Sequence, residues 1–168
     1  MEIFVHIPYS LERNYGKAVN DFMVKLDDTD WAVIMDYDAM FTHNKWFHVV
    51  HEAIKEGGAL ITCPTNRTGN PYQKAKVDEN NHNMEYHYKI GKELYEKHGN
   101  EVKDFECPGY LMSGYTMIFP KTLWSAIGGF PQGQYGVDND VHRKAMEEGF
   151  PIKILPGVYV YHAYFRLK

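Results

Sequence analysis

Hydrophobic residues recur along the chain with two different spacings, which divide it into alternating strands and helices. Short alternating or continuous apolar runs predict strands at residues 2–7, 31–35, 59–63, 115–119, 152–155 and 158–161. Apolar residues three and four positions apart predict helices at residues 14–26, 44–56, 84–98, 121–127 and 138–148. This order predicts an α/β fold, a three-layer α/β/α sandwich with a mainly parallel central sheet.

Two acidic residues follow the most apolar of the predicted strands. Residues 31–35 are hydrophobic throughout, which is typical of a strand buried on both faces, and Asp36 and Asp38 come directly after them. In an extended segment both carboxylates point to one side while Tyr37 faces the other. Ligands of open α/β sheets bind beyond the carboxyl ends of strands, so we expect this pair to hold Mg²⁺ or Mn²⁺ with a diphosphate. An isolated Asp-x-Asp is also common at the solvated start of a loop.

Residues 66–83 are polar and rich in helix-breaking residues, which predicts a surface loop after the strand at residues 59–63. We expect this loop to border the bound ligand, because it leaves the same edge of the sheet. Gly114 stands just before another predicted strand. Its missing side chain is explained either by close approach of an acceptor to the backbone or by a bulge.

Composition narrows the class of protein. The 168 residues are 44% hydrophobic and 24% charged, as in a soluble domain, and we expect a single domain over residues 1–168. A net charge of -4 without a basic block argues against nucleic acid as a partner. The longest apolar runs are about five residues, far short of the roughly 20 of a membrane span. With no signal-like N-terminus and only Cys63 and Cys107, we expect a cytoplasmic protein.

A second set of motifs accompanies the acidic pair. A Gly-Gly-Phe turn at residues 128–130 precedes Asp138, which opens a predicted helix closed by Gly149, and the last predicted strand leads to His162. In this order the motifs resemble the nucleotide-sugar glycosyltransferases of the GT-A fold, nearest the large family 2. The resemblance extends from about residue 14 to residue 162 and implies the fold of that family.

The resemblance also implies roles for individual residues. Asp36 and Asp38 correspond to the Asp-x-Asp that binds the metal and the sugar-diphosphate donor, with Asp38 favoured as the direct ligand. His162 corresponds to a histidine that completes the metal site in many members, and imidazole is a reasonable ligand for Mn²⁺. Asp138 corresponds to the catalytic base of inverting members. Val137 stands where the family usually has glutamate.

The beginning of the chain departs from the family. Members normally start with a strand, a helix and a second strand that form most of the nucleoside pocket. Here Pro8 is followed within a few residues by a segment similar to the helix before the Asp-x-Asp strand. The resemblance therefore implies a shortened nucleotide-binding half, in which Tyr9 stacks on the base and Ser10 or Asn14 hydrogen-bonds it. Tyr9 is equally explained as the aromatic residue of a turn.

The implied function is a metal-dependent glycosyltransferase that moves a sugar from a nucleoside diphosphate to a hydroxyl of a carbohydrate or other acceptor. UDP is the favoured nucleotide and inversion the favoured outcome. Two alternatives stay open, a nucleotidyltransferase and a non-catalytic carbohydrate- or partner-binding relative. The first is expected to carry a glycine-rich, basic phosphate loop after the first strand, which residues 8–13 do not provide. A sheet edge left by the shortening would suit a homo-oligomer.

Overall fold

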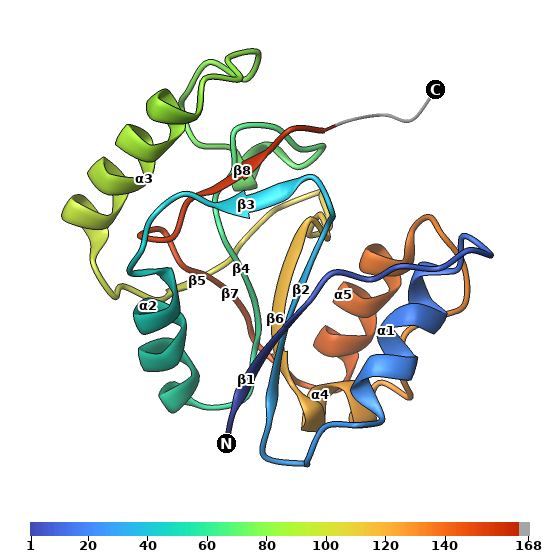
Figure 1. Cartoon of the computed structure of the whole chain (residues 1–168). Helices are drawn as coiled ribbons and strands as arrows, with labels where there is room; N and C mark the ends of the chain where they lie inside the picture. Colours follow the sequence, from blue (N-terminus) through green and yellow to red (C-terminus); the bar gives the residue numbers. More distant parts are fainter. Residues whose placement is uncertain (165–168) are drawn as a thin grey trace.

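The structure is a computed structural model and describes residues 1–164. Within them, a main sheet has the strand order β1-β2-β6-β4-β7-β5, and a second sheet pairs β3 with β8 (Figure 1). The strands of the main sheet are, in chain order, β1 (Ile3–His6), β2 (Trp31–Met35), β4 (Leu60–Thr62), β5 (Lys103–Asp104), β6 (Thr116–Pro120) and β7 (Ile152–Ile154). The second sheet is formed by β3 (Ala39–Phe41) and β8 (Val160–His162).

Helices cover both faces of the main sheet, as Figure 1 shows. One face carries α1 (Tyr15–Met23), α4 (Lys121–Ala126) and α5 (Val137–Glu147), whose buried residues Val19, Leu123 and Val141 share a core cluster with Ile34 and Phe119 of the sheet. The other face carries α2 (Trp46–Ala53), continued by the 3₁₀ helix η1 (Ile54–Glu56), while α3 (Met84–His98) lies beside the second sheet (Figure 1). A short 3₁₀ helix, η2 (Pro71–Gln73), lies in the loop before α3. The structure therefore confirms the α/β class.

The sheet is mixed, which corrects the expectation of a mainly parallel one. The central strand β6 runs antiparallel to both of its neighbours, β2 and β4, and β5 runs antiparallel to β7. Only the β1–β2 and β4–β7 pairs are parallel. A continuous apolar run reports that a strand is buried on both faces, as all five residues of β6 are, but it does not report the direction of the strand.

Most predicted elements appear within a few residues of their expected bounds. The strand at residues 31–35 and the helix at residues 84–98 match β2 and α3 at both ends. The pattern of the sequence does not predict β3 and β5, which are three and two residues long and, unlike β4, β7 and β8, do not lie in a longer run with strand-like spacing. In residues 1–164, no helix combines the length and the apolar character needed to cross a membrane.

Candidate active site

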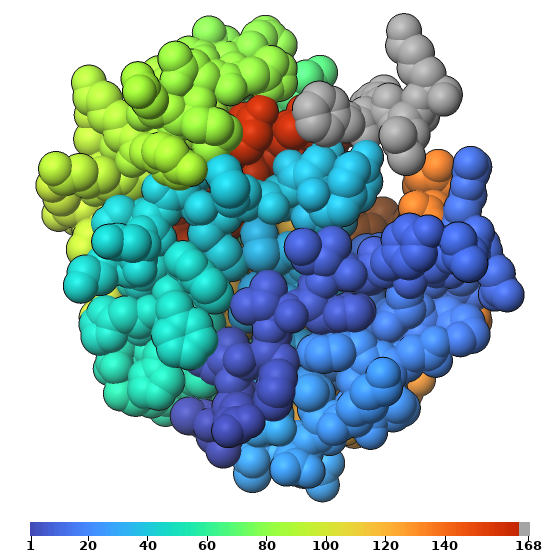
Figure 2. Space-filling model, viewed as in Figure 1, coloured from blue at the N-terminus to red at the C-terminus, as the bar shows by residue number. Residues whose placement is uncertain are grey.

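A cleft of about 800 Å³ opens at the edge of the sheet where β2 ends and β6 begins. Figure 2 shows the surface hollowed between the cyan segment after β2 and the dark blue segment after β1. The lining residues come from segments that are far apart in the sequence. They include Pro8, Tyr15, Asp36, Tyr37, Asp38, Thr68, Gly69, Ser113, Gly114, Tyr115, Tyr135, Asp138, His162 and Tyr164. All four candidates for the metal site and the catalytic base therefore face one cavity.

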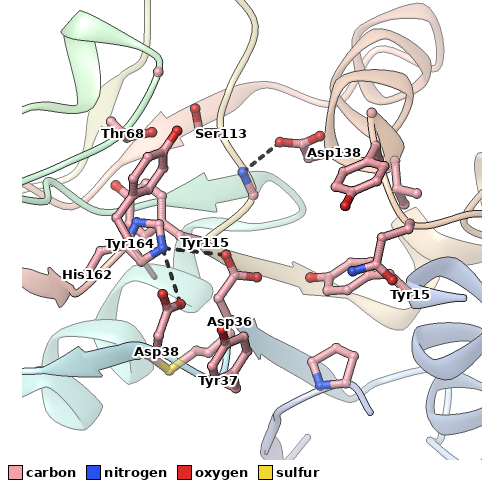
Figure 3. A pocket seen from close by; sticks show the side chains of 18 of the residues that line it. Tyr15, Asp36, Tyr37, Asp38, Thr68, Ser113, Tyr115, Asp138, His162 and Tyr164 are labelled. Atoms are coloured by element: carbon pink, nitrogen blue, oxygen red, sulfur yellow. Dashed lines mark hydrogen bonds and ion pairs between the residues drawn. The ribbon is translucent and has the colours of Figure 1, made fainter. Parts of the chain in front are cut away.

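Three of these residues converge on one point. Asp36, Asp38 and His162 each offer a ligand atom, and these atoms lie within 4.8 Å of one another. The Nε2 atom of His162 lies 3.3 Å from Oδ1 of Asp38 and 3.7 Å from Oδ2 of Asp36. Figure 3 shows the three side chains pointing toward one another on one side of the cleft, with Asp138 on the other. Two carboxylates and one imidazole are a donor set suited to Mn²⁺ or Mg²⁺.

The small second sheet places His162 beside the acidic pair. In the antiparallel pairing of β3 with β8, Ala39 lies opposite His162, and the backbone N–H of Ala163 donates to the carbonyl of Asp38 at 2.9 Å. Asn66 secures the same point with its buried side chain. Its Oδ1 accepts from the His162 N–H at 2.8 Å, and its Nδ2 donates to the His162 carbonyl at 3.1 Å. Strand pairing and one buried amide therefore hold the backbone of His162.

A backbone carbonyl determines which ring nitrogen of His162 carries a proton. Nδ1 lies 2.9 Å from the carbonyl oxygen of Arg67, which can only accept a hydrogen bond, so Nδ1 is the donor. In the neutral ring this leaves the lone pair of Nε2 directed at the two carboxylates. Histidines that bind metals are usually oriented by such a hydrogen bond at the other nitrogen. The residues present therefore fit a divalent cation.

The cleft has a strongly negative character. Three carboxylates face it, and among its described lining residues none is lysine or arginine. Burial raises the pKa of Asp36 to about 6, the nearby carboxylates of Asp38 and Asp138 add to the increase, and His162 opposes it. An anionic ligand such as a diphosphate can enter this field only if a cation accompanies it.

Asp138 stands in the first turn of α5 and is held by backbone N–H groups. Its Oδ2 accepts from the N–H of Gly114 at 2.9 Å and its Oδ1 accepts from the N–H of Asn139 at 3.0 Å. A Cβ atom at position 114 would lie only 2.6 Å from Cβ of Asp138. Gly114 therefore lacks a side chain because Asp138 packs against it. It lies outside β6, which begins two residues later at Thr116, so the glycine is not part of a bulge within that strand.

The residues expected to hold the nucleoside lie outside the lining of the cleft. Pro8 lines it, whereas Tyr9 is 78% exposed and Ser10 accepts from the backbone N–H of Asn14 through its hydroxyl. Asn14 caps α1 by accepting from the N–H of Lys17. The same Asn14 oxygen accepts from the N–H of Gly133, so this side chain ties α1 to the loop that leads to Asp138. The structure gives Asn14 a structural role, and base recognition by these three residues stays a prediction.

Several lining residues carry no recognisable signal in the sequence. Tyr15 is the first residue of α1, and Tyr115 stacks on the His162 ring with their centroids 5.3 Å apart. Thr68 and Gly69 belong to the polar loop that was expected to border the ligand. A tyrosine at a helix start or before a strand has no distinguishing pattern in one sequence, because the same residue is as common in cores and turns.

Comparison of the chain with protein-family models finds no match, and neither does a search of curated proteins. The function is therefore inferred from the geometry of the cleft and from the motifs of the sequence.

Proposed function

We propose that the protein is a metal-dependent glycosyltransferase that moves a sugar from a nucleoside diphosphate, with UDP favoured, to a hydroxyl acceptor. The observation that carries the proposal is the convergence of Asp36, Asp38 and His162 within 4.8 Å in a cleft that Asp138 also lines. We further propose that the mixed sheet between two helix layers is a shortened GT-A fold. The order of the motifs along the chain supports this assignment.

The triad would hold Mn²⁺ or Mg²⁺ through the carboxylates of Asp36 and Asp38 and through Nε2 of His162. When bound, such an ion neutralises the charge that develops on the leaving diphosphate. The absence of lysine and arginine among the described lining residues supports this requirement, because no protein cation in the cleft offsets the phosphate charge. The nearby carbonyl of Arg67 keeps the imidazole in the tautomer that the site needs.

Asp138 is the proposed general base. Each of its oxygens accepts one backbone N–H and keeps a further lone pair, so the carboxylate can take the proton of an attacking hydroxyl while it stays in position. The Gly114 contact fixes the carboxylate on the opposite side of the cleft from the triad, as Figure 3 shows. With the base on one side of the sugar and the diphosphate on the other, the acceptor hydroxyl would attack opposite the leaving group, which supports inversion at the transferred carbon.

A second candidate function is a carbohydrate-binding relative without catalytic activity. The observation that favours it is the position of Tyr9, Ser10 and Asn14, none of which lines the cleft. A donor site without these contacts would bind the nucleoside weakly. The two functions therefore differ in whether a nucleotide binds in a metal-dependent way.

Calorimetric titration with UDP, GDP and CDP, each with and without Mn²⁺, tests the proposal. We expect one nucleotide to bind in the presence of Mn²⁺ only, and we expect Asp38→Asn to abolish that binding because it removes a charged ligand of the cation. Absence of metal-dependent binding for all three, together with binding of free sugars, would support the carbohydrate-binding relative instead.

A further inference from the structure

The hydroxyl group of Tyr15 is buried beside the cleft and is unsatisfied. Among the described residues, it is one of two buried side-chain polar atoms without a hydrogen-bond partner, and the other, Nε2 of His6, does not belong to a residue of the cleft. Buried hydroxyls are almost always hydrogen-bonded, because leaving one unpaired is costly. An unpaired hydroxyl at the wall of a cleft therefore indicates that a ligand supplies the partner.

Several contacts hold the backbone around Tyr15. A Cβ atom on the next residue, Gly16, would lie 1.8 Å from the carbonyl oxygen of Pro131, so the first turn of α1 packs directly against this loop. The N–H of Gly16 also donates to the carbonyl of Gly133 at 3.1 Å. Together with the Asn14 cap, these contacts fix the start of α1 relative to the loop before Asp138.

Tyr15 can only donate a hydrogen bond in this position. Burial raises the pKa of its hydroxyl well above the ordinary value, and the charges of Asp36 and Asp138 raise it further. The group therefore stays protonated and neutral, and it cannot act as a base. The hydroxyl therefore needs a hydrogen-bond acceptor, which an oxygen atom of the ligand would supply.

The charges around Tyr15 select among acceptor oxygens. Asp36 and Asp138 both act on the hydroxyl electrostatically, and a cation at the triad would offset only Asp36, so a negatively charged oxygen next to Tyr15 would still meet the carboxylate of Asp138. A hydroxyl of a sugar avoids this conflict, because its oxygen accepts from Tyr15 while its own proton is donated to a carboxylate. The surroundings therefore favour a neutral, polyhydroxylated group over a phosphate.

We propose that the hydroxyl of Tyr15 donates a hydrogen bond to a hydroxyl oxygen of the sugar that is transferred. This inference rests on the proposed function and adds a binding residue for the donor sugar. In this arrangement the sugar lies between Asp36 and Asp138, and the phosphates lie at the triad of Asp36, Asp38 and His162.

The test compares Tyr15→Phe with the wild type by calorimetry in Mn²⁺, using three matched pairs: UDP and UDP-glucose, GDP and GDP-mannose, and CDP and CDP-glucose. For the pair that the wild type binds, the ratio of the two dissociation constants measures the contribution of the sugar. We expect Tyr15→Phe to weaken the nucleotide sugar about three- to tenfold, as expected for one neutral hydrogen bond, and to leave the nucleotide within about twofold.

Thermal unfolding without ligand supplies a second readout and a matched control. Tyr15→Phe removes an unsatisfied group, so its melting temperature should equal or exceed that of the wild type. Tyr159→Phe is the control, because the buried Tyr159 hydroxyl lies 2.9 Å from Nδ1 of His87 and Tyr159 is outside the cleft. We expect this control to melt about 2–4 °C lower and to keep the wild-type affinity for the nucleotide sugar.

Four results would overturn the inference. An unchanged ratio in Tyr15→Phe would show that the sugar does not contact the hydroxyl, and equal weakening of nucleotide and nucleotide sugar would place the contact on the diphosphate. A melting temperature as low as that of Tyr159→Phe would show that the hydroxyl has a partner within the protein. If the wild type binds neither member of any pair with Mn²⁺, the proposed function itself fails, and this inference fails with it.

Discussion

Replacing Asp138 with asparagine separates proton transfer from donor binding. Both carboxylate oxygens accept backbone N–H groups, from Gly114 at 2.9 Å and from Asn139 at 3.0 Å. An asparagine keeps one oxygen for one of these donors and turns its amide toward the other, which loses one hydrogen bond and leaves an N–H unpaired. We expect this exchange to lower the free energy of unfolding by about 1–2 kcal/mol.

The effect on turnover should be larger than the effect on stability. General-base catalysis contributes about 10²- to 10⁴-fold, which corresponds to roughly 3–5 kcal/mol in the activation free energy. Metal-dependent binding of the donor should stay near the wild-type level, because the triad is intact. Asp38→Asn should show the converse, with donor binding weakened first, since it removes a charged ligand of the cation.

The assay is steady-state transfer at saturating Mn²⁺ and donor, with donor affinity measured separately by calorimetry. Asp140→Asn is the matched control, because Asp140 lies on the same helix with its side chain 50% exposed and pairs with Arg143 at 2.9 Å. We expect this control to retain turnover within about twofold, as is usual for an exposed ion pair. If Asp138→Asn keeps its turnover and Asp140→Asn loses it, the alignment at Val137 is misleading and Asp140 is the base.

Three further predictions concern the support of the site. Asn66→Ala should weaken Mn²⁺ binding about 10- to 100-fold, because it removes both side-chain hydrogen bonds to the His162 backbone. Unchanged affinity in a Mn²⁺ titration would contradict the proposed role of Asn66 in positioning His162. Mn²⁺ should raise the melting temperature less at pH 5.5 than at pH 7.5, because Asp36, with its pKa of about 6, carries at pH 5.5 a proton that competes with the metal. An equal rise in melting temperature at both pH values would exclude Asp36 as a ligand. Burial lowers the pKa of His142, whose Nδ1 accepts from the N–H of Met112, so the unfolded chain binds more protons and the stability of the protein should fall as the pH drops below 6.5. His142→Asn keeps an acceptor, and in urea unfolding it should lose less stability between pH 7.5 and pH 5 than the wild type. An equal loss in both proteins would refute the reasoning.

The sequence predicted the chemical groups of the candidate site better than it predicted the path of the chain between them. Asp36 and Asp38 follow a strand whose apolar run is unmistakable, and the structure places His162 and Asp138 at the same cleft. The antiparallel direction of β6 was not predictable, because side-chain burial is the same in either direction. The pairing of β3 with β8 was not predictable for a different reason, since the three residues of β3 do not lie in a longer run with strand-like spacing.

The contacts of polar residues are the least predictable from the sequence. Base recognition by Asn14 stays a prediction, and the structure adds two contacts that the sequence did not indicate: its side chain caps α1 and accepts from Gly133. Asn66 carried no expectation of its own, yet it forms two buried hydrogen bonds to His162. An asparagine that binds a ligand and one that binds a distant backbone are identical in composition and in local spacing. The difference lies in long-range contacts, which a single sequence does not reveal.

The two sides of the cleft are positioned by independent means, and this explains why so small a domain can hold a defined site. On one side, the β3–β8 pairing and Asn66 fix His162 beside the acidic pair that follows β2. On the other, Gly114 receives the Asp138 carboxylate at a contact that no larger residue would allow. Gly114 lies just before β6, and β6 pairs directly with β2. The separation between the triad and the proposed base is therefore set by adjacent strands of the sheet core, so a substitution that shifts β6 against β2 should impair transfer more than it impairs metal binding.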